Sequence, residues 1–295
     1  MTAVTSRSLI ASATLEATPP HSLPLPRPLD IDAKASDAAM PQPGDRNAEP
    51  GISVVVPVYN EAGNIPALIA EIAAAAALVP IREIVYVDDG STDGSLRLLQ
   101  QRLGDVGMLR IVRHRRCLGQ SAAFLSGARA ASQDLLVFMD GDLQNDPADV
   151  ASLYRCYRAA PLGSRLAVLG ERAVRNDRWL RRLSSRLANR LRRAVLKDGT
   201  RDTGCSLKLI PRRDFLDLPY FDHMHRFLPA MLLRNGVEIT HVSVSHRARV
   251  NGRSKYGFWN RAAVGAVDLL GAAWLSRRRL PADYEPIEIS KTDFR

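Results

Sequence analysis

Several features of other protein classes are missing from this chain of 295 residues. Its three cysteines, Cys117, Cys156 and Cys205, lie far apart and form no C-x-x-C pair, so neither a disulfide framework nor a zinc site is expected. No run of about 18 apolar residues occurs, so no membrane-spanning helix is expected. The N-terminus shows no basic segment before an apolar core, so no signal peptide is expected. These absences predict a protein of a reducing compartment, in the cytosol or on the cytosolic side of a membrane.

Beyond the first 50 residues, acidic residues are outnumbered by basic ones. The formal net charge is +10, but residues 1–50 hold four Lys/Arg against six Asp/Glu, so residues 51–295 carry +12. A domain this basic favours polyanions: nucleic acid, phosphorylated ligands or an anionic membrane face. Residues 1–50 are rich in Ala, Pro, Ser and Thr without periodicity and are predicted to be a disordered tail. Residues 281–295 are expected to form a flexible C-terminal tail.

Strand and helix patterns alternate from Ile52 onward. "ISVVVPV" is a continuous β-branched run, typical of a strand buried on both faces, and a helical pattern follows it. "EIVYVDD", "MLRIVRH" and "DLLVFMD" are further predicted strands, each separated from the next by a helix. The pattern predicts an α/β domain over residues 51–280, with a mostly parallel central sheet, helices on both faces and amphipathic helices at its C-terminal end.

Polar clusters follow these strands, where ligands bind in parallel sheets. After the fourth strand, Asp140, Asp142 and Gln144 alternate, and in an extended segment three such oxygen donors face one site. Mg²⁺ or Mn²⁺ prefers ligands of this kind; the alternative is an acidic turn that leaves the sheet. Asp88 and Asp89 end the second strand, where a carboxylate accepts hydrogen bonds from a ribose or a base. Helix capping by Ser91, Thr92 or Asp93 is the alternative there.

Two segments of the second half suggest a charged or membrane surface. Residues 172–193 contain nine arginines and one acid, which fits a solvated helix face, anionic headgroups and a lipid phosphate, or nucleic acid. Residues 262–275 are too short to span a bilayer. They are expected either to lie in the membrane interface, with Trp274 at the headgroups, or to pack on the core.

Six motifs in order resemble one known family. "VVVPVYNE", "VDDGSTD" and "MDGDLQNDP" resemble the GT-A fold of family-2 glycosyltransferases. "DTGCSLKLIPR", "HRFLPAML" and "SHRARVNGRSKYG" resemble its polyprenyl-phosphate branch, which includes dolichol-phosphate mannose synthases and undecaprenyl-phosphate glycosyltransferases. The resemblance covers about residues 52–275. It implies metal-dependent, inverting transfer of one sugar from a UDP- or GDP-linked donor to undecaprenyl or dolichyl phosphate.

The resemblance also implies roles for individual residues. Asp142, Arg172 and Arg175 are the expected catalytic residues, the two arginines at the acceptor phosphate. Asp140, Asp142 and Gln144 are the expected ligands of Mg²⁺ or Mn²⁺ and of the donor diphosphate. The residues expected to hold the donor are Pro57, Tyr59, Glu61 and Asp89 at the nucleoside, and Arg247, Arg249, Ser254 and Lys255 in a loop that closes over the phosphates. Glu171 departs from the family, where a small or hydroxylated residue is common, as does the missing transmembrane hairpin of some relatives.

The expected partners are the nucleotide-sugar, the polyprenyl phosphate, an anionic membrane surface at the cytoplasmic face and an integral-membrane protein, without nucleic acid. Two other readings stay open: a family-2 transferase acting on another acceptor hydroxyl, and a basic nucleic-acid-binding protein. Processive family-2 transferases carry a Q-x-x-R-W motif, and this sequence lacks that motif. A nucleic-acid-binding protein would not explain the two acidic loops. A dinucleotide-dependent oxidoreductase is disfavoured because no G-x-G-x-x-G follows the first strand.

Overall fold

The computed structural model describes residues 49–172, 192, 194–200, 202–248 and 258–278, the last range with side chains from 265 onward. The chain divides into two units, Met1–Ala48 and Glu49–Arg295, and every element described here belongs to the second. The predicted tails lie almost wholly outside these residues, as does most of the predicted arginine-rich helix.

Seven strands form one sheet in the order β3-β2-β1-β4-β6-β5-β7. Only β6 runs antiparallel to its two neighbours among these strands, so the predicted mostly parallel sheet is confirmed. The strands are β1 (Ile52–Val58), β2 (Ile81–Asp88), β3 (Leu109–Arg113), β4 (Leu135–Phe138), β5 (Leu166–Arg172), β6 (Lys208–Pro211) and β7 (Glu238–Val244).

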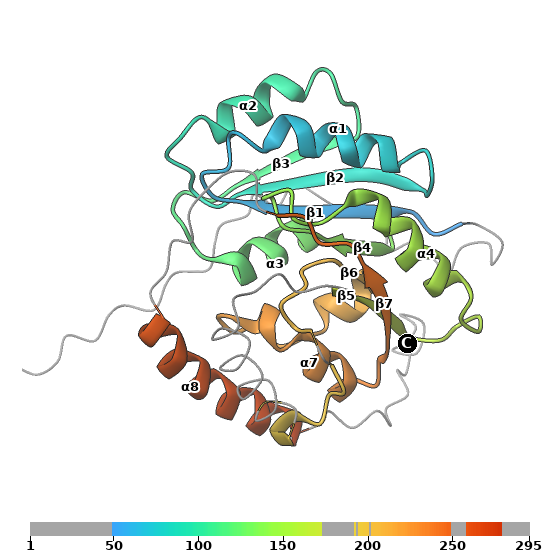
Figure 1. The fold of residues 1–295 in the computed structure, drawn as a ribbon, viewed down its shortest axis with the longest axis vertical. Helices are drawn as coiled ribbons and strands as arrows, with labels where there is room; N and C mark the ends of the chain where they lie inside the picture. Colours follow the sequence, from blue (N-terminus) through green and yellow to red (C-terminus); the bar gives the residue numbers. More distant parts are fainter. Residues whose placement is uncertain (1–48, 173–191, 193, 201, 249–257, 279–295) are drawn as a thin grey trace, which may run out of the picture. The chain divides into compact units, whose positions relative to one another are not determined.

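Helices cover both faces of the sheet, as the alternating pattern predicts (Figure 1). One face carries α1 (Ile65–Ala75), α2 (Ser95–Arg102) and α4 (Val150–Arg158). The other carries α3 (Gln120–Ala130), α6 (Arg212–Leu216), α7 (Leu228–Arg234) and α8 (Phe258–Ser276). Short 3₁₀ turns, η1 (Pro147–Asp149) and η2 (Met224–Arg226), precede α4 and α7.

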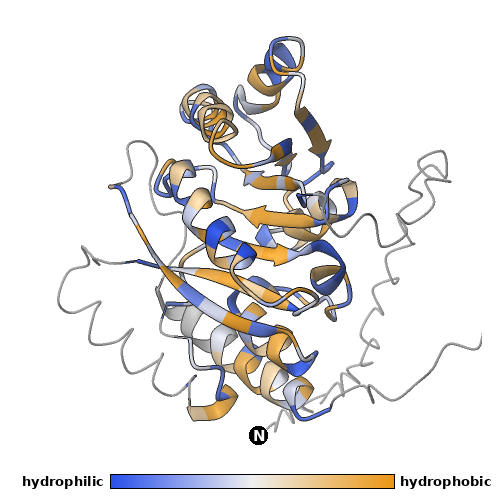
Figure 2. Cartoon of the chain, turned by 90° about the vertical axis from the view of Figure 1, so that its right-hand side faces the viewer, coloured by the Kyte–Doolittle hydropathy of each residue, from blue (hydrophilic) through white to orange (hydrophobic). Residues whose placement is uncertain are grey.

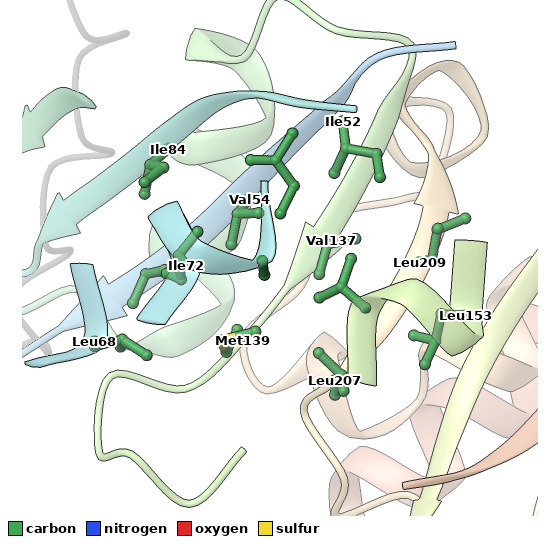
Figure 3. Packing of buried hydrophobic residues seen from close by; sticks show 14 of the residues in the cluster. Ile52, Val54, Leu68, Ile72, Ile84, Val137, Met139, Leu153, Leu207 and Leu209 are labelled. Carbon is green, nitrogen blue, oxygen red and sulfur yellow. The ribbon is translucent and has the colours of Figure 1, made fainter. Parts of the chain in front are cut away.

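Apolar strand residues explain why both faces are covered. All residues of β1 except Pro57 are buried, and the inner strands are largely hydrophobic along their length (Figure 2). On the α1 side, Val54, Ile84 and Val137 of three neighbouring strands pack with Leu68 and Ile72 of α1 (Figure 3). A strand with apolar side chains on both faces is stable only between two helical layers.

β6 is the strand that the pattern does not predict. It has four residues, "KLIP", and enters the sheet antiparallel between β4 and β5. Its first residue, Lys208, is charged yet only 5% exposed, so hydropathy alone gives no strand signal here. The structure places this lysine beneath the carboxyl end of β4.

The strand order reverses at β1, which has β2 on one side and β4 on the other. Crossovers leave this point in opposite directions, so the loops after β1, β2 and β4 meet at the carboxyl ends of the strands, where the ligand-binding crevice of open α/β sheets lies. Both predicted acidic clusters lie at or just beyond the ends of β2 and β4, and the predicted nucleoside residues Pro57, Tyr59 and Glu61 lie at the end of β1 and in the loop after it. No helix in the described part of the chain is long and apolar enough to cross a membrane.

Candidate active site

The loops after β1 and β2 are tied together by hydrogen bonds. Asn60, in the left-handed conformation with φ 57°, accepts from the backbone N–H of Thr92 at 2.7 Å and of Asp93 at 3.3 Å. In return the N–H of Asn60 donates to Ser91 Oγ at 3.0 Å, and that of Glu61 donates to Ser95 Oγ at 3.0 Å. The predicted nucleoside residues of both loops therefore belong to one rigid wall of the crevice.

The three predicted residues of the first loop differ in their surroundings. Pro57 lies within β1 as its only partly exposed residue, and Tyr59 is half-buried just beyond the strand. Glu61 accepts a hydrogen bond from Asn64 Nδ2 at 2.7 Å at the start of α1. In the second loop, Asp93 accepts from the N–H of Ser95 at 2.9 Å, but the N-cap residue of α2 is Gly94, so none of Ser91, Thr92 and Asp93 is the N-cap.

Asp89 holds the loop between β3 and α3. Its carboxylate accepts from the N–H groups of Leu118 and Gly119 at 2.8 and 2.9 Å, and from the Cys117 thiol at 3.2 Å. His114 Nδ1 lies 2.7 Å from Asp89 Oδ1, and His114 Nε2 lies 2.9 Å from Ser126 Oγ. Although burial raises the pKa of Asp89, these hydrogen bonds outweigh it and lower the pKa overall. The geometry makes Asp89 a positioning residue for this loop.

Gly90 lets the same loop approach the end of β2. Its φ is +73°, and a Cβ at this position would lie 2.5 Å from the carbonyl carbon of Arg116. Only glycine satisfies both the conformation and the contact. Before it, Asp88 is fully buried, accepts from the N–H of Ser91 at 3.1 Å, and has no partner for Oδ2 among the described residues.

The segment after β4 is not extended, so that part of the prediction is wrong. Gly141 and Asp142 form a turn, and Leu143 follows with φ 62°, an unusual conformation for leucine. A Cβ at Gly141 would lie 2.8 Å from Val58 Cγ1, which explains glycine between the two aspartates. The turn, rather than strand alternation, brings the Asp140 and Asp142 carboxylates near each other.

Asp140 and Asp142 form a carboxylate pair at the base of the crevice. Burial and the nearby Asp142 carboxylate both raise the pKa of Asp140. Asp140 Oδ1 accepts from Gln120 Nε2 at 2.7 Å, and Asp142 Oδ1 accepts from the N–H of Gln144 at 3.1 Å. A divalent cation would relieve this repulsion, and hard cations bind such oxygens together with substrate phosphates. Among the described residues, no three His, Cys, Asp or Glu side chains are placed to hold a metal ion together, so this pair would share the ion with ligand oxygens.

Lys208 supplies a buried positive charge beside this pair. Burial lowers the pKa of Lys208, whereas the neighbouring Asp140 and Asp202 carboxylates raise it. Its ammonium group donates to the carbonyl oxygen of Cys205. Ser206 Oγ donates to Asn145 Oδ1 at 2.7 Å and so ties the entry to β6 to the turn after β4.

Gln144 faces the segment after β7. Its Nε2 lies 3.4 Å from His246 Nε2 and 3.5 Å from the carbonyl oxygen of Arg247, whose N–H donates to Gln144 O at 2.9 Å. Arg247 Nη1 pairs with Glu71 at 2.6 Å and Nη2 with Asp146 at 2.7 Å. Arg247 is thus bound to α1 and to the turn after β4, beside the carboxylate pair.

Arg172, at the end of β5, makes a bidentate ion pair with Asp202. Its Nε and Nη2 donate to the two carboxylate oxygens at 2.7 Å each, and Asp202 is 5% exposed. Asp202 also lies near Lys208, so Arg172 and the carboxylate pair are linked through buried charges. The neighbouring Glu171 is half-buried. Arg175, Arg249, Ser254 and Lys255 lie outside the described residues.

Sequence reasoning missed four residues that shape this site: Asn60, Gln120, Ser206 and Lys208. Asn60 had a local signal, since it follows a strand and asparagine tolerates positive φ. Gln120 and Ser206 contact the turn after β4 across 20 and 61 residues of sequence, and no pattern announces such pairs. Lys208 was hidden within the unpredicted β6.

Comparison with known proteins assigns this arrangement to a family. The family model described as "Glycosyl transferase family 2" matches residues 53–218, which include both loops and the carboxylate pair. The chain is 37% identical over 233 residues to a dodecaprenyl-phosphate galacturonate synthase of Rhizobium johnstonii, covering 77% of this chain and 67% of the relative. It is 33% identical over 209 residues to an undecaprenyl-phosphate 4-deoxy-4-formamido-L-arabinose transferase of Aeromonas hydrophila, covering 70% and 63%. This chain thus matches about two thirds of the length of these relatives.

Solved structures agree on the fold. Glucosyl-3-phosphoglycerate synthase of Mycobacterium tuberculosis, crystallised with Mn²⁺, UDP and its product, superposes with a TM-score of 0.59 at 20% identity, over 80% of this chain and 83% of that one. Mannosyl-3-phosphoglycerate synthase of Rubrobacter xylanophilus gives a TM-score of 0.61 at 16% identity, over 83% and 80%. The fold is that of the GT-A glycosyltransferases, as predicted.

Proposed function

This chain belongs to glycosyl transferase family 2, and from that premise we propose that it transfers one sugar from a nucleotide-sugar to the phosphate of a polyprenyl lipid. Family membership makes the chain a glycosyltransferase. The choice of acceptor rests on relatives above 30% identity, among them the two described above, whose names both specify a polyprenyl phosphate. The site supports the choice, because phosphate binding needs cations. Arg172 pairs with Asp202, and Asp202 lies near Lys208, which in turn lies near Asp140 of the carboxylate pair.

The donor diphosphate and a divalent cation, Mg²⁺ or Mn²⁺, belong at Asp140 and Asp142 in this proposal. Their carboxylates offer hard oxygen ligands, and the diphosphate supplies others. A cation there neutralises the charge that develops on the leaving diphosphate. Gln144 and Arg247 border the same site. The nucleoside, uridine or guanosine, lies along the wall built from the loops after β1 and β2.

The acceptor needs no catalytic base. A phosphate monoester has a second pKa near ~6 and is largely ionised at neutral pH. What the chain must supply is positive charge that brings two anionic reactants together, and Arg172 is the described residue suited to this. Arg175 and the loop residues Arg249, Ser254 and Lys255 complete the proposed set. Direct displacement by the phosphate oxygen inverts the anomeric carbon.

The decisive experiment compares two acceptors. The full chain is incubated with nucleotide-sugars, Mg²⁺ or Mn²⁺, and either undecaprenyl phosphate or undecaprenol. We expect a glycolipid product from the phosphate and at least about 100-fold less from the alcohol, which has no ionised oxygen. Equal transfer to both acceptors would show that the enzyme acts on hydroxyl groups instead.

Arg172 is tested by substitutions that separate binding from folding. Arg172→Lys keeps the charge opposite Asp202 but loses the bidentate geometry, so the KM for polyprenyl phosphate should rise about tenfold or more. The matched control is Arg165→Lys at the other end of β5, where Arg165 Nε and Nη2 pair with Asp214 Oδ1 at 2.9 and 2.6 Å. Arg165→Lys should leave the KM unchanged. Equal effects of the two variants on KM would assign Arg172 to structure alone.

The proposed location of the enzyme is the cytoplasmic face of a membrane, to which it binds peripherally. A lipid acceptor requires access to a bilayer, and the basic segment from Arg172 to Arg193 supplies charge for an anionic surface. Most of that segment lies outside the described residues. An integral-membrane protein that holds the enzyme at the bilayer is a further proposed partner.

A further inference from the structure

The outer face of α8 carries an uncovered apolar stripe. Val267, Leu270 and Trp274 follow one another at helical spacing and are 70%, 71% and 56% exposed. The opposite side of the helix packs on the core through Ala272, which is fully buried against the α7 layer. A helix that is already anchored on one side does not need three large apolar residues on the other. This second face requires a partner.

Two loops bring further exposed apolar residues to the same region. Leu118, in the loop before α3, is 37% exposed, and Tyr220, before η2, is 48% exposed. Close approaches between side chains link the two loops and α8. His223 Nδ1 lies 3.1 Å from Asp268 Oδ2 of α8, and a Cβ at Gly119 would lie 3.8 Å from Asp222 Oδ1. Leu118 and Tyr220 are therefore next to residues that join their loops to each other and to α8.

Arginines flank these apolar residues. Arg115 and Arg116 are exposed just before Leu118, and Arg277 and Arg278 are exposed just after the stripe on α8. The guanidinium carbon of Arg278 lies 4.4 Å from the centre of the Trp274 ring, so the cation covers the edge of the apolar stripe. Among the described residues, the acids near these arginines are Asp268, which faces His223, and Asp222, which is exposed. Positive charge thus dominates where the apolar residues end.

Exposed apolar side chains bordered by arginines, with a tryptophan between them, match the layers of a membrane interface. Aliphatic residues reach the acyl boundary, the indole lies at headgroup level, and arginines meet lipid phosphates. A second copy of the chain would bring like charges together at the same contact. An anionic bilayer is therefore the occupant that fits both the apolar and the charged residues.

We propose that Leu118, Tyr220, Val267, Leu270 and Trp274, with Arg115, Arg116, Arg277 and Arg278, form a surface that docks on an anionic lipid bilayer. This inference deepens the proposed function, because a polyprenyl phosphate acceptor must be taken from a membrane. It also assigns membrane contact to α8 and two loops, in addition to the arginine-rich segment that starts at Arg172.

The test measures binding of the full chain to vesicles of phosphatidylcholine with and without phosphatidylglycerol. The triple variant Val267→Ser, Leu270→Ser, Trp274→Ser should reduce the partition coefficient at least about tenfold. The double variant Arg115→Ser, Arg116→Ser should reduce it about fivefold for each arginine, and only on anionic vesicles at low salt. The control is Leu78→Ser, Leu162→Ser, which removes leucines 64% and 83% exposed on other parts of the chain and should change nothing.

Two further measurements keep the outcome clear. A variant with Trp274 as its only tryptophan, made by Trp179→Phe and Trp259→Phe, should be quenched by brominated lipids in the vesicles. The triple serine variant should keep its transfer rate toward undecaprenyl phosphate in detergent, where docking is not needed. Unchanged vesicle binding by the triple variant, or no quenching of Trp274, would overturn the docking surface while leaving the proposed activity standing. Loss of transfer to every acceptor would overturn the proposed function instead.

Discussion

Two aspartates, one after β2 and one after β4, show how identical residues serve different purposes. Both Asp89 and Asp142 follow buried strands and both are almost fully buried. The Asp89 carboxylate accepts from two N–H groups and a thiol in one loop, with His114 beside it, and so orders the protein itself. Asp142 instead lies beside the second carboxylate of Asp140, an arrangement that is unfavourable until a cation binds.

Asp142→Asn keeps the shape of this side chain and removes its charge. We expect kcat to fall about 100-fold or more, because an electrostatic contact to the leaving diphosphate is lost. Binding of Mn²⁺ and UDP or GDP, measured by calorimetry, should weaken as well. Asp105→Asn, at an exposed acid that follows α2, is the matched control and should leave both quantities unchanged. Full activity of Asp142→Asn in excess chelator would rule out the metal assignment.

Asn60 acts through its hydrogen bonds and through its backbone conformation, which two substitutions separate. Asn60→Gly removes the acceptor for Thr92 and Asp93 but tolerates φ 57°. Asn60→Ala also adds strain of about 1–2 kcal/mol. We expect both variants to bind the nucleoside diphosphate about fivefold more weakly, because the loops after β1 and β2 lose their tie. Only Asn60→Ala should show a further drop in thermal stability. Wild-type affinity in Asn60→Gly would mean that the tie does not order the donor site.

At the scale of elements, Glu83 of β2 links β1, β3 and the segment before β4 through hydrogen bonds. This β2 residue is 4% exposed and accepts from Ser53 Oγ at 2.5 Å, from the N–H of Ser132 at 2.8 Å and from Arg110 Nη1 at 2.6 Å. Its partners lie on β1, on β3 and in the segment before β4, near the strand ends remote from the site. Burial raises the pKa of Glu83. The hydrogen bonds and the Arg110 charge lower it by more, so the pKa of Glu83 is lowered overall.

The lowered pKa of Glu83 makes its contribution depend on pH. A carboxylate whose pKa is lower when folded stabilises the protein above its unfolded pKa of about 4.3, and that contribution is lost as pH falls through the folded value. Glu83→Gln should cost about 2 kcal/mol of unfolding free energy at pH 7 and flatten the loss of stability below pH ~4.3. Denaturant unfolding from pH 3 to 7 measures both, with Glu238→Gln on exposed β7 as control. Parallel pH profiles for wild type and Glu83→Gln would show that this carboxylate does not titrate as described.

Elements with a regular pattern could be predicted from the sequence, and elements defined by distant contacts could not. β1 and β4 are almost wholly apolar, β2 is apolar from Ile84 to Val87, and the polar residues after these strands lie at the carboxyl ends of the sheet, as their positions in the sequence predict. β6 escaped prediction because it is short and begins with a charged residue that burial alone would disfavour. At D-x-D the sequence left both an extended segment and an acidic turn open, and the close approach of Gly141 to Val58 decides for the turn.

At the scale of the whole molecule, long-range pairs decide which cations reach the substrate. The motifs predict several arginines at phosphates, yet two of the described ones are already paired: Arg172 with Asp202, and Arg247 with Glu71 and Asp146. None of these acids is adjacent in sequence to its arginine. A cationic side chain held by an acidic partner acts on an anionic ligand from a fixed position, which favours alignment of the ligand over simple attraction.

The boundary of the folded unit gives the last prediction. The chain divides between Ala48 and Glu49, and Tyr154 Oη of α4 donates to the carbonyl oxygen of Pro50 at 3.4 Å. Residues 1–48 lack the apolar periodicity that core packing requires. A chain beginning at Glu49 should therefore unfold in one cooperative transition within about 1 kcal/mol of the full chain and keep its transfer rate. A chain beginning at Val54 is the contrast, because it removes Ile52 and Ser53 of β1, both fully buried, and should lose cooperative unfolding. Circular dichroism melts and transfer assays on the two shortened chains measure these differences. If the chain that begins at Glu49 already unfolds without cooperativity, residues before Glu49 belong to the folded unit.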